Sequence, residues 1–152
     1  METQNFSKIY KSKIGYLKIV SDGESITNVG FSDGKEESKN SDKIVNECIK
    51  QLEEYFAGKR TEFNIKLNPK GTEFQKSVWK ELTNIPYGQT KSYKQVATLV
   101  GNDKASRAVG NANNKNPIAI IVPCHRVIGA NKKLVGYAGG LDVKEQLLEL
   151  EK

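Results

Sequence analysis

Cysteine and histidine are scarce in this sequence of 152 residues, which has two cysteines, Cys48 and Cys124, and one histidine, His125. Two cysteines cannot build the several bridges of a small disulfide-stabilised secreted domain. Together with one histidine they also fall short of the four ligands of a structural zinc site. We therefore expect no metal and no cofactor, and a cytoplasmic protein whose two thiols are reduced.

Long hydrophobic runs are also missing, since the longest, residues 118–123, has the length of a strand and not of a membrane span. The first residues lack the charged and then apolar pattern of a secretion signal. Hydrophobic residues make up 37% of the chain and charged residues 28%. This composition is typical of a globular protein of one or two small domains, and it predicts no membrane association.

Acidic residues are nearly absent from residues 82–141, where Asp103 is the only one. The same window has eight basic residues: Lys91, Lys94, Lys104, Arg107, Lys115, Arg126, Lys132 and Lys133. Such an imbalance indicates a surface that meets a polyanion, although a solvated lysine-rich surface gives the same count. Acidic phospholipid is the weaker partner, because the window has no basic helix with a bulky apolar face.

The first half of the chain is predicted to form strands followed by one helix. Short β-rich runs predict strands over residues 14–20, 26–31 and 62–67. Asp22-Gly23 indicates a hairpin between the first two. Apolar spacing predicts a helix that starts at an N-cap on Ser41 and ends near residue 57. Cys48 lies on its apolar stripe and is expected to be an inert core thiol.

The second half of the chain is predicted to be mostly helical. Thr72 to Gln75 and Ser92 to Gln95 have the pattern of capping boxes, and Asp103 and Asp142 are candidate caps of two later helices. The helix after Ser92, a turn with glycine and a basic helix together indicate a helix-turn-helix, a pattern that many small helical pairs share.

Cys124 and His125 are the residues able to do covalent chemistry. The β-branched run 118–122 predicts a buried strand that ends at Pro123, which places Cys124 at the strand exit. A base or a positive charge nearby would make the thiol a better nucleophile. Neighbouring side chains on an extended chain point to opposite faces, so we expect a water to link the two residues. A buried structural cysteine beside a satisfied histidine is the alternative.

His125 would also need an acid to orient it. The candidates are Asp103, Glu145, Glu149 and Glu151.

Pro123-Cys124-His125-Arg126-Val127 resembles the active-site signature of the O6-alkylguanine-DNA alkyltransferases, also called methylated-DNA–protein-cysteine methyltransferases. The resemblance extends over further positions: Phe74-Gln75, Val78-Trp79, Ile85-Pro86-Tyr87-Gly88, Ser92-Tyr93, Arg107-Ala108-Val109-Gly110, Asn116-Pro117, Gly139-Gly140-Leu141 and Lys144-Glu145. It is dense over residues 72–152, whereas residues 1–71 match only in their plan of strands and helix.

This resemblance implies an α/β (α+β) fold in two domains. Residues 1–68 would form an N-terminal RNase H-like small sheet with a helix. Residues 72–152 would form a helical DNA-binding and active-site domain with a winged-helix-like helix-turn-helix.

The resemblance also implies residue roles. Cys124 would be the alkyl acceptor, His125 the base acting through a water, and Glu151 the acid that orients His125. Asn116 would hold the active-site turn, and Tyr93 would rotate the target phosphate and give a proton to the departing guanine. Arg107 would replace the flipped nucleotide in the stack. Ser92, Lys104, Ala105 and Arg126 complete the expected DNA contacts, and Trp79, Val127, Tyr137, Ala138 and Gly139 the expected substrate pocket.

The function implied is direct reversal of DNA damage, in which one chain takes one alkyl group from O6-alkylguanine, or from O4-alkylthymine, and is consumed. The partner would be double-stranded DNA, bound through its minor groove by a monomer, with the damaged base flipped out. Ala138 departs from the family, many members of which have a serine there that can contact guanine O6.

Two rival hypotheses about the function remain. A helix-turn-helix protein that binds DNA or a lesion without transfer would leave the thiol unmodified. A Cys–His hydrolase would turn over through an acyl-enzyme.

Overall fold

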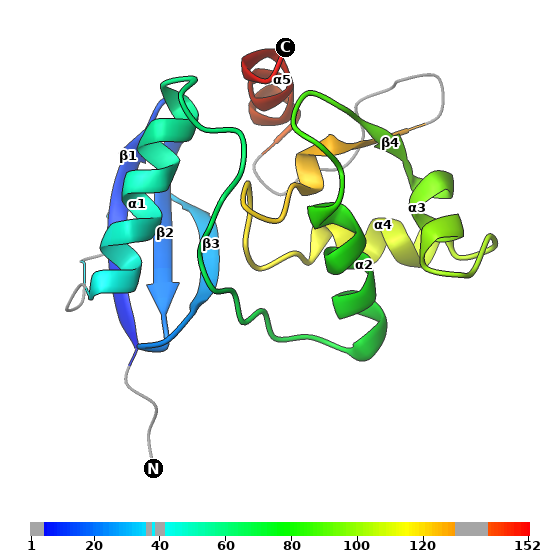
Figure 1. The fold of residues 1–152 in the computed structure, drawn as a ribbon, viewed down its shortest axis with the longest axis horizontal. Coiled ribbons are helices and arrows are strands. Elements are labelled where there is room, and N and C mark those ends of the chain that lie inside the picture. Colours follow the sequence, from blue (N-terminus) through cyan, green and yellow to red (C-terminus); the bar gives the residue numbers. More distant parts are fainter. Residues whose placement is uncertain (1–4, 36–37, 39–41, 130–139) are drawn as a thin grey trace. The chain divides into compact units, whose positions relative to one another are not determined.

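The computed structural model describes residues 5–35, 38, 42–129 and 140–152, which fall into two compact units, Met1–Pro69 and Lys70–Lys152 (Figure 1). The first is a small sheet with one helix and the second is mostly helical. The expected mixed α/β fold is therefore confirmed. No helix among the described residues is both long and apolar enough to cross a bilayer.

Unit 1 contains an antiparallel sheet of strands β1 (Phe6–Ser12), β2 (Gly15–Ser21) and β3 (Ile26–Ser32), in that order. The sequence prediction missed β1. The expected hairpin at Asp22-Gly23 joins β2 to β3, and Gly23 has a φ of 98°, which suits glycine. The strand expected over residues 62–67 is wrong, since in this segment only Leu67 pairs with the sheet, through one bridge to Ile26.

Helix α1 (Lys43–Phe56) packs its apolar stripe on one face of this sheet (Figure 1). Its N-cap is Asp42 and not Ser41: the Asp42 carboxylate accepts from the Val45 N–H at 2.8 Å. Ser21 of β2 donates to the same carboxylate at 2.9 Å, which ties the helix start to the sheet. Cys48 is fully buried in this interface, and burial raises the pKa of its thiol to about 12.

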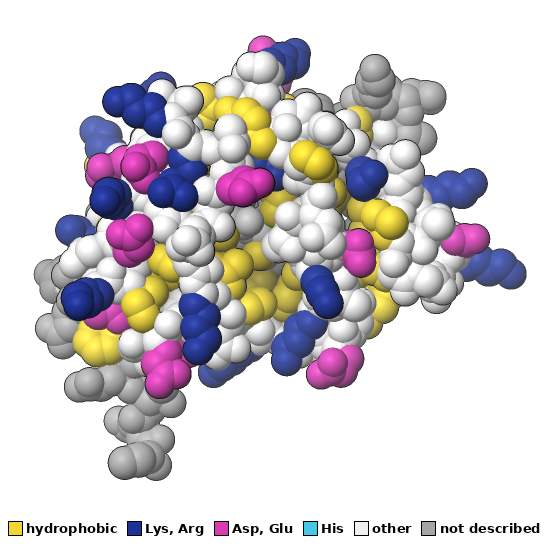
Figure 2. Space-filling model, viewed as in Figure 1, with side chains coloured by type: hydrophobic (Ala, Val, Ile, Leu, Met, Phe, Trp, Pro, Cys, Tyr) yellow, Lys and Arg dark blue, Asp and Glu magenta, His cyan; other side chains and the backbone are white. Residues whose placement is uncertain are grey.

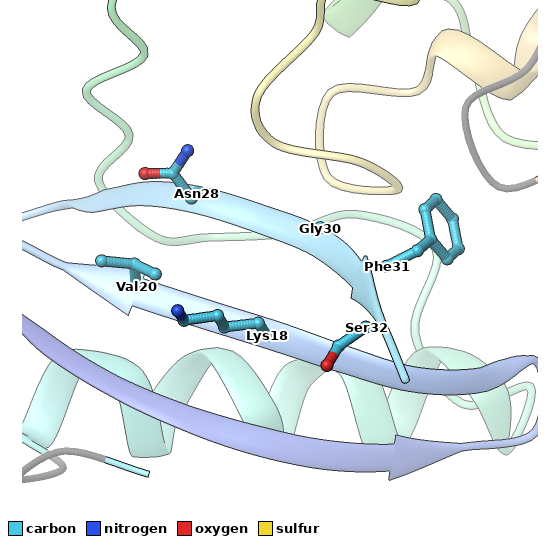
Figure 3. A pocket seen from close by; sticks show the side chains of 6 residues that line it. All are labelled: Lys18, Val20, Asn28, Gly30, Phe31 and Ser32. Carbon is cyan, nitrogen blue, oxygen red and sulfur yellow. The ribbon is translucent and has the colours of Figure 1, made fainter. Parts of the chain in front are cut away.

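The opposite face of the sheet has an open hollow of about 350 Å³ (Figure 3). Its lining comes from β2 and β3: Lys18, Val20, Asn28, Gly30, Phe31 and Ser32. These residues include no cysteine and no histidine, so the hollow holds no counterpart of the Cys124–His125 pair.

Unit 2 is built on helices α2 (Glu73–Thr83), α3 (Tyr93–Leu99), α4 (Ser106–Asn114) and α5 (Leu141–Leu150). Both expected capping boxes are present, at Thr72 for α2 and at Ser92 for α3. The other two expected caps are wrong. Ala105 precedes α4 and Gly140 precedes α5, without side-chain caps, so Asp103 and Asp142 do not cap these helices.

Helix α4 packs against both α2 and α3, and the turn between α3 and α4 gives the helix pair expected of a helix-turn-helix (Figure 1). A short parallel pair, β4 (Lys91–Ser92) and β5 (Val127–Ile128), links the start of α3 to the 3₁₀ turn η1 (Cys124–Arg126). This pairing holds the segment that contains Cys124 and His125 beside the beginning of α3.

Candidate active site

The segment before Cys124 is buried, but it is not the strand that its sequence predicts. Residues 118–122 are at most 8% exposed, yet residues 119–122 form tight turns. The Ile121 N–H bonds the Ala119 carbonyl at 2.8 Å, and Ile120 has a φ of 72°, a rare conformation for a β-branched residue. The apolar run therefore indicated burial correctly and extended conformation wrongly.

Asn116 holds these turns together. Its Nδ2 donates to the Val122 carbonyl at 2.8 Å and to the Ile118 carbonyl at 3.2 Å, while its Oδ1 accepts from the Ile118 N–H at 3.0 Å. One side chain thus satisfies three backbone groups that a strand would have paired in a ladder. These three contacts are the geometry that the expected role of Asn116, holding the turn before Cys124, requires.

Cys124 is the first residue of η1 and is 6% exposed. Its carbonyl accepts from the Nδ2 of Asn113, on α4, at 3.3 Å. Cys124 is therefore held both by the turn before it and by the helix that precedes that turn.

His125, the next residue, is completely buried and bonds the carboxylate of Glu151 with 2.7 Å between Nε2 and Oε2. Glu151 is the C-cap residue of α5 and is 3% exposed. Among the four acids that were candidates to orient His125, the structure thus selects Glu151. Burial lowers the pKa of His125, since desolvation outweighs the attraction of the Glu151 carboxylate.

A tight turn brings Glu151 into place. Gly88 has a φ of 81°, and a Cβ there would lie 3.0 Å from the Glu151 carbonyl oxygen, so only glycine allows this approach without displacement. The neighbouring Tyr87 donates its hydroxyl to the Leu150 carbonyl at 3.2 Å. The Ile85-Pro86-Tyr87-Gly88 sequence therefore holds the end of α5 in place, next to His125.

Lys144 and Tyr93 complete the surroundings of Cys124. The Lys144 ammonium is buried and donates to the Val127 carbonyl at 2.6 Å. Burial lowers the pKa of Lys144 to about 8, against the attraction of a Cys124 thiolate. Burial also raises the pKa of Tyr93, and the charge of Cys124 adds to this. A Cβ on Gly110 would lie 3.7 Å from the Tyr93 ring, so the ring crosses α4 where that helix has no side chain.

Three expected site residues lie inside unit 2 instead of on a binding surface. Arg126, expected to contact DNA, is 6% exposed and bonds Glu151 and the Ile85 carbonyl. Ala105, a second expected DNA contact, is 8% exposed. Trp79, expected in the substrate pocket, is 2% exposed and donates its indole N–H to the Ala112 carbonyl at 2.8 Å, as a core residue does.

The other expected DNA contacts lie on or beside the helix pair. Arg107 on α4 and Lys104 in the preceding turn are exposed, and Ser92 caps α3. Figure 2 shows lysine and arginine side chains at the edge of unit 2 formed by α3 and the turn that follows it. The pocket residues Tyr137, Ala138 and Gly139 lie outside the described residues, whereas Val127 is buried in β5.

Lys144 and Asn113 are site residues that the sequence reasoning did not assign. Lys144 had a detectable signal, because it precedes Leu147 by three residues and Glu151 by seven on one face of α5. A lysine on an apolar face that also carries the orienting acid indicates a buried polar site. Asn113 had no such signal, since it lies in a stretch of several asparagines.

Comparisons with known proteins agree with this geometry. Residues 5–69 match the family model "6-O-methylguanine DNA methyltransferase, ribonuclease-like domain", and residues 73–152 match its "DNA binding domain". A methylated-DNA–protein-cysteine methyltransferase of Methanosarcina acetivorans is 56% identical over 149 residues, which cover 94% of this chain and 96% of that protein. A Mycobacterium leprae protein of the same name is 51% identical, over 93% of this chain and 88% of its own length.

Solved structures show the same fold. The crystal structure of Mycobacterium tuberculosis O6-methylguanine methyltransferase superposes with a TM-score of 0.90 at 45% identity, over 98% of this chain and 93% of that one. A structure of Mycobacterium tuberculosis OGT in complex with DNA gives 0.89 at 46% identity, over 96% of this chain and 92% of that one. On these matches, which span both units, the chain belongs to the 6-O-methylguanine DNA methyltransferase family.

Proposed function

We propose that this chain repairs DNA by taking the alkyl group of O6-alkylguanine onto the sulfur of Cys124. The observation that carries the proposal is the buried contact of 2.7 Å between Glu151, at the end of α5, and His125, the residue directly after Cys124. A structural cysteine needs no oriented base beside it. A nucleophile does, because the thiolate is the reactive form.

The reaction balances with the groups present. The Cys124 thiol passes its proton through a water to His125, whose other nitrogen is held by Glu151. Sulfur then attacks the alkyl carbon, so that an S–C bond forms as the bond from carbon to O6 breaks. The departing guanine takes up one proton, and Tyr93 is the proposed donor to it. The thioether is stable and nothing in the site removes it, so one chain repairs one base.

The damaged base must leave the helix before a cysteine that is 6% exposed can reach it. We propose that Arg107, exposed on the small-residue helix α4, fills the vacated position from the minor groove. We further propose that the protein acts as a cytoplasmic monomer.

The test is a titration of reactive sites with free O6-benzylguanine. One equivalent of guanine should be released per chain, and a second addition should release none. Cys124→Ser should release none at all. Cys48→Ala is the matched control, because it removes the other buried thiol and should still release one equivalent. Continued turnover would support the rival hydrolase, and an unmodified thiol would support a protein that only binds DNA.

A further inference from the structure

Arg126 directs its guanidinium into unit 2 and not toward solvent. Its Nε donates to Glu151 Oε1 at 2.8 Å and its Nη2 to Glu151 Oε2 at 3.0 Å. The remaining nitrogen, Nη1, donates to the Ile85 carbonyl at 2.7 Å, and the guanidinium carbon lies 5.8 Å from the centre of the Tyr87 ring. An arginine held by both carboxylate oxygens and a carbonyl has a fixed position.

These contacts determine which nitrogen of His125 carries a proton. Arginine is always protonated and only donates, so its bonds to both oxygens of Glu151 stabilise the ionised carboxylate. The same carboxylate oxygen, Oε2, lies 2.7 Å from His125 Nε2. That nitrogen must then be the donor, so in the neutral imidazole Nδ1 keeps its lone pair. Among the described residues no group bonds Nδ1.

Charge balance around His125 depends on the same arginine. The neighbouring ionisable groups are Cys124 and Arg126 on η1, Lys144 and Glu151 on α5, Tyr87 before α3, and Tyr93 at its start. Without the Arg126 charge, the full attraction of the buried carboxylate would fall on His125 and favour its protonation. A protonated imidazole cannot accept the proton of Cys124.

We propose that Arg126 is a positioning residue of the transfer reaction, which fixes and neutralises the Glu151 carboxylate so that His125 keeps an unprotonated Nδ1 as the base for Cys124. The inference rests on the proposed role of His125 as that base. It assigns to Arg126 a task inside the protein in place of the DNA contact expected from the sequence.

The test measures the rate of alkyl transfer from free O6-benzylguanine between pH 5 and 9, which avoids any effect on DNA binding. Arg126→Gln should move the acidic limb of the rate profile upward by about one pH unit or more, because His125 then protonates more readily. Arg126→Lys restores the charge and should return the midpoint toward that of the wild type. Arg60→Gln, which breaks the arginine–glutamate pair with Glu54 in unit 1, is the matched control and should leave the profile unchanged.

A uniform loss of rate with an unmoved midpoint in Arg126→Gln would overturn the proposal, because a purely structural arginine acts in that way. His125→Gln separates this failure from failure of the proposed function. If the acidic limb persists in His125→Gln, His125 is not the base and the proposed mechanism itself is wrong.

A second measurement does not depend on how any variant folds. His125 is the only histidine of the chain, so its imidazole nitrogen signals can be read directly by NMR in the wild-type protein. The proposal predicts a proton on Nε2 and none on Nδ1 at neutral pH, and a titration below the usual histidine value of about 6.5. A titration above that value would show that Arg126 does not offset Glu151, and would overturn the proposal.

Discussion

Asn116 bonds the carbonyl of Val122 at 2.8 Å, two residues before Cys124. Together with the two bonds to Ile118, this contact replaces the hydrogen bonds that a strand would have supplied. It allows a β-branched segment to turn sharply, with Ile120 at a positive φ. The path of the segment that leads to Cys124 therefore depends on one amide side chain.

Asn116→Ala should destabilise unit 2 by about 2 kcal/mol, because it leaves buried backbone groups without partners. Denaturant unfolding measures this change. Transfer to Cys124 should slow as well, since the turn loses its fixed geometry. Asn114→Ala, at an exposed position on α4, is the control and should change stability by less than about 0.5 kcal/mol. Equal stability of the two variants would contradict the role given to Asn116.

Arg107→Ala should impair repair of duplex DNA much more than attack on free O6-benzylguanine. The reason is that Arg107 is exposed on α4 and is proposed to support the flipped state, which the free base does not need. Single-turnover rates on the two substrates provide the comparison. Equal losses on both would remove Arg107 from nucleotide flipping.

DNA affinity should fall steeply with salt, because the exposed cations of the helix pair displace counterions from phosphates. Lys104→Ala should lower the slope of log affinity against log salt by about one. Lys66→Ala changes an exposed lysine of unit 1 and should leave the slope as it is. Fluorescence anisotropy over a salt series measures both, and a flat profile would count against nucleic acid as the partner.

Lys144 should make stability depend on pH above neutrality. Its pKa is about 8 in the folded chain and about 10.5 when unfolded, so between these values the unfolded chain binds more protons. The free energy of unfolding of the wild type, relative to Lys144→Met, should therefore rise as pH increases from about 8 to about 10.5. Unfolding of both proteins across this range measures the difference, and a constant or falling difference would be inconsistent with a buried lysine.

Local patterns predicted much of the fold. The capping boxes at Thr72 and Ser92 depend on residues three positions apart, so the sequence alone located the starts of α2 and α3. The conformation of the segment before Cys124 was harder to predict. Its apolar residues indicate burial, but its path depends on Asn116, whose effect on the backbone is visible only in three dimensions.

The candidate site, too, could be predicted only in part from the sequence. Motif resemblance named Cys124, His125 and Glu151, and the structure brings the last two into contact. The motif resemblance could not show which way Arg126 points, because an arginine in a basic window suits both a DNA contact and a buried ion pair. Arg126 points inward because it bonds Glu151 at the end of α5, which lies 25 residues further along the chain.

The most direct test of alkyl transfer is mass spectrometry of the intact chain after mixing with a duplex that contains O6-methylguanine, followed by peptide mapping. The account predicts a gain of about 14 Da, one methyl in place of one hydrogen, on the peptide that contains Cys124. Cys124→Ser should bind the same duplex and gain nothing. An unchanged mass in the wild type, or a methyl group on the peptide that contains Cys48, would contradict the account.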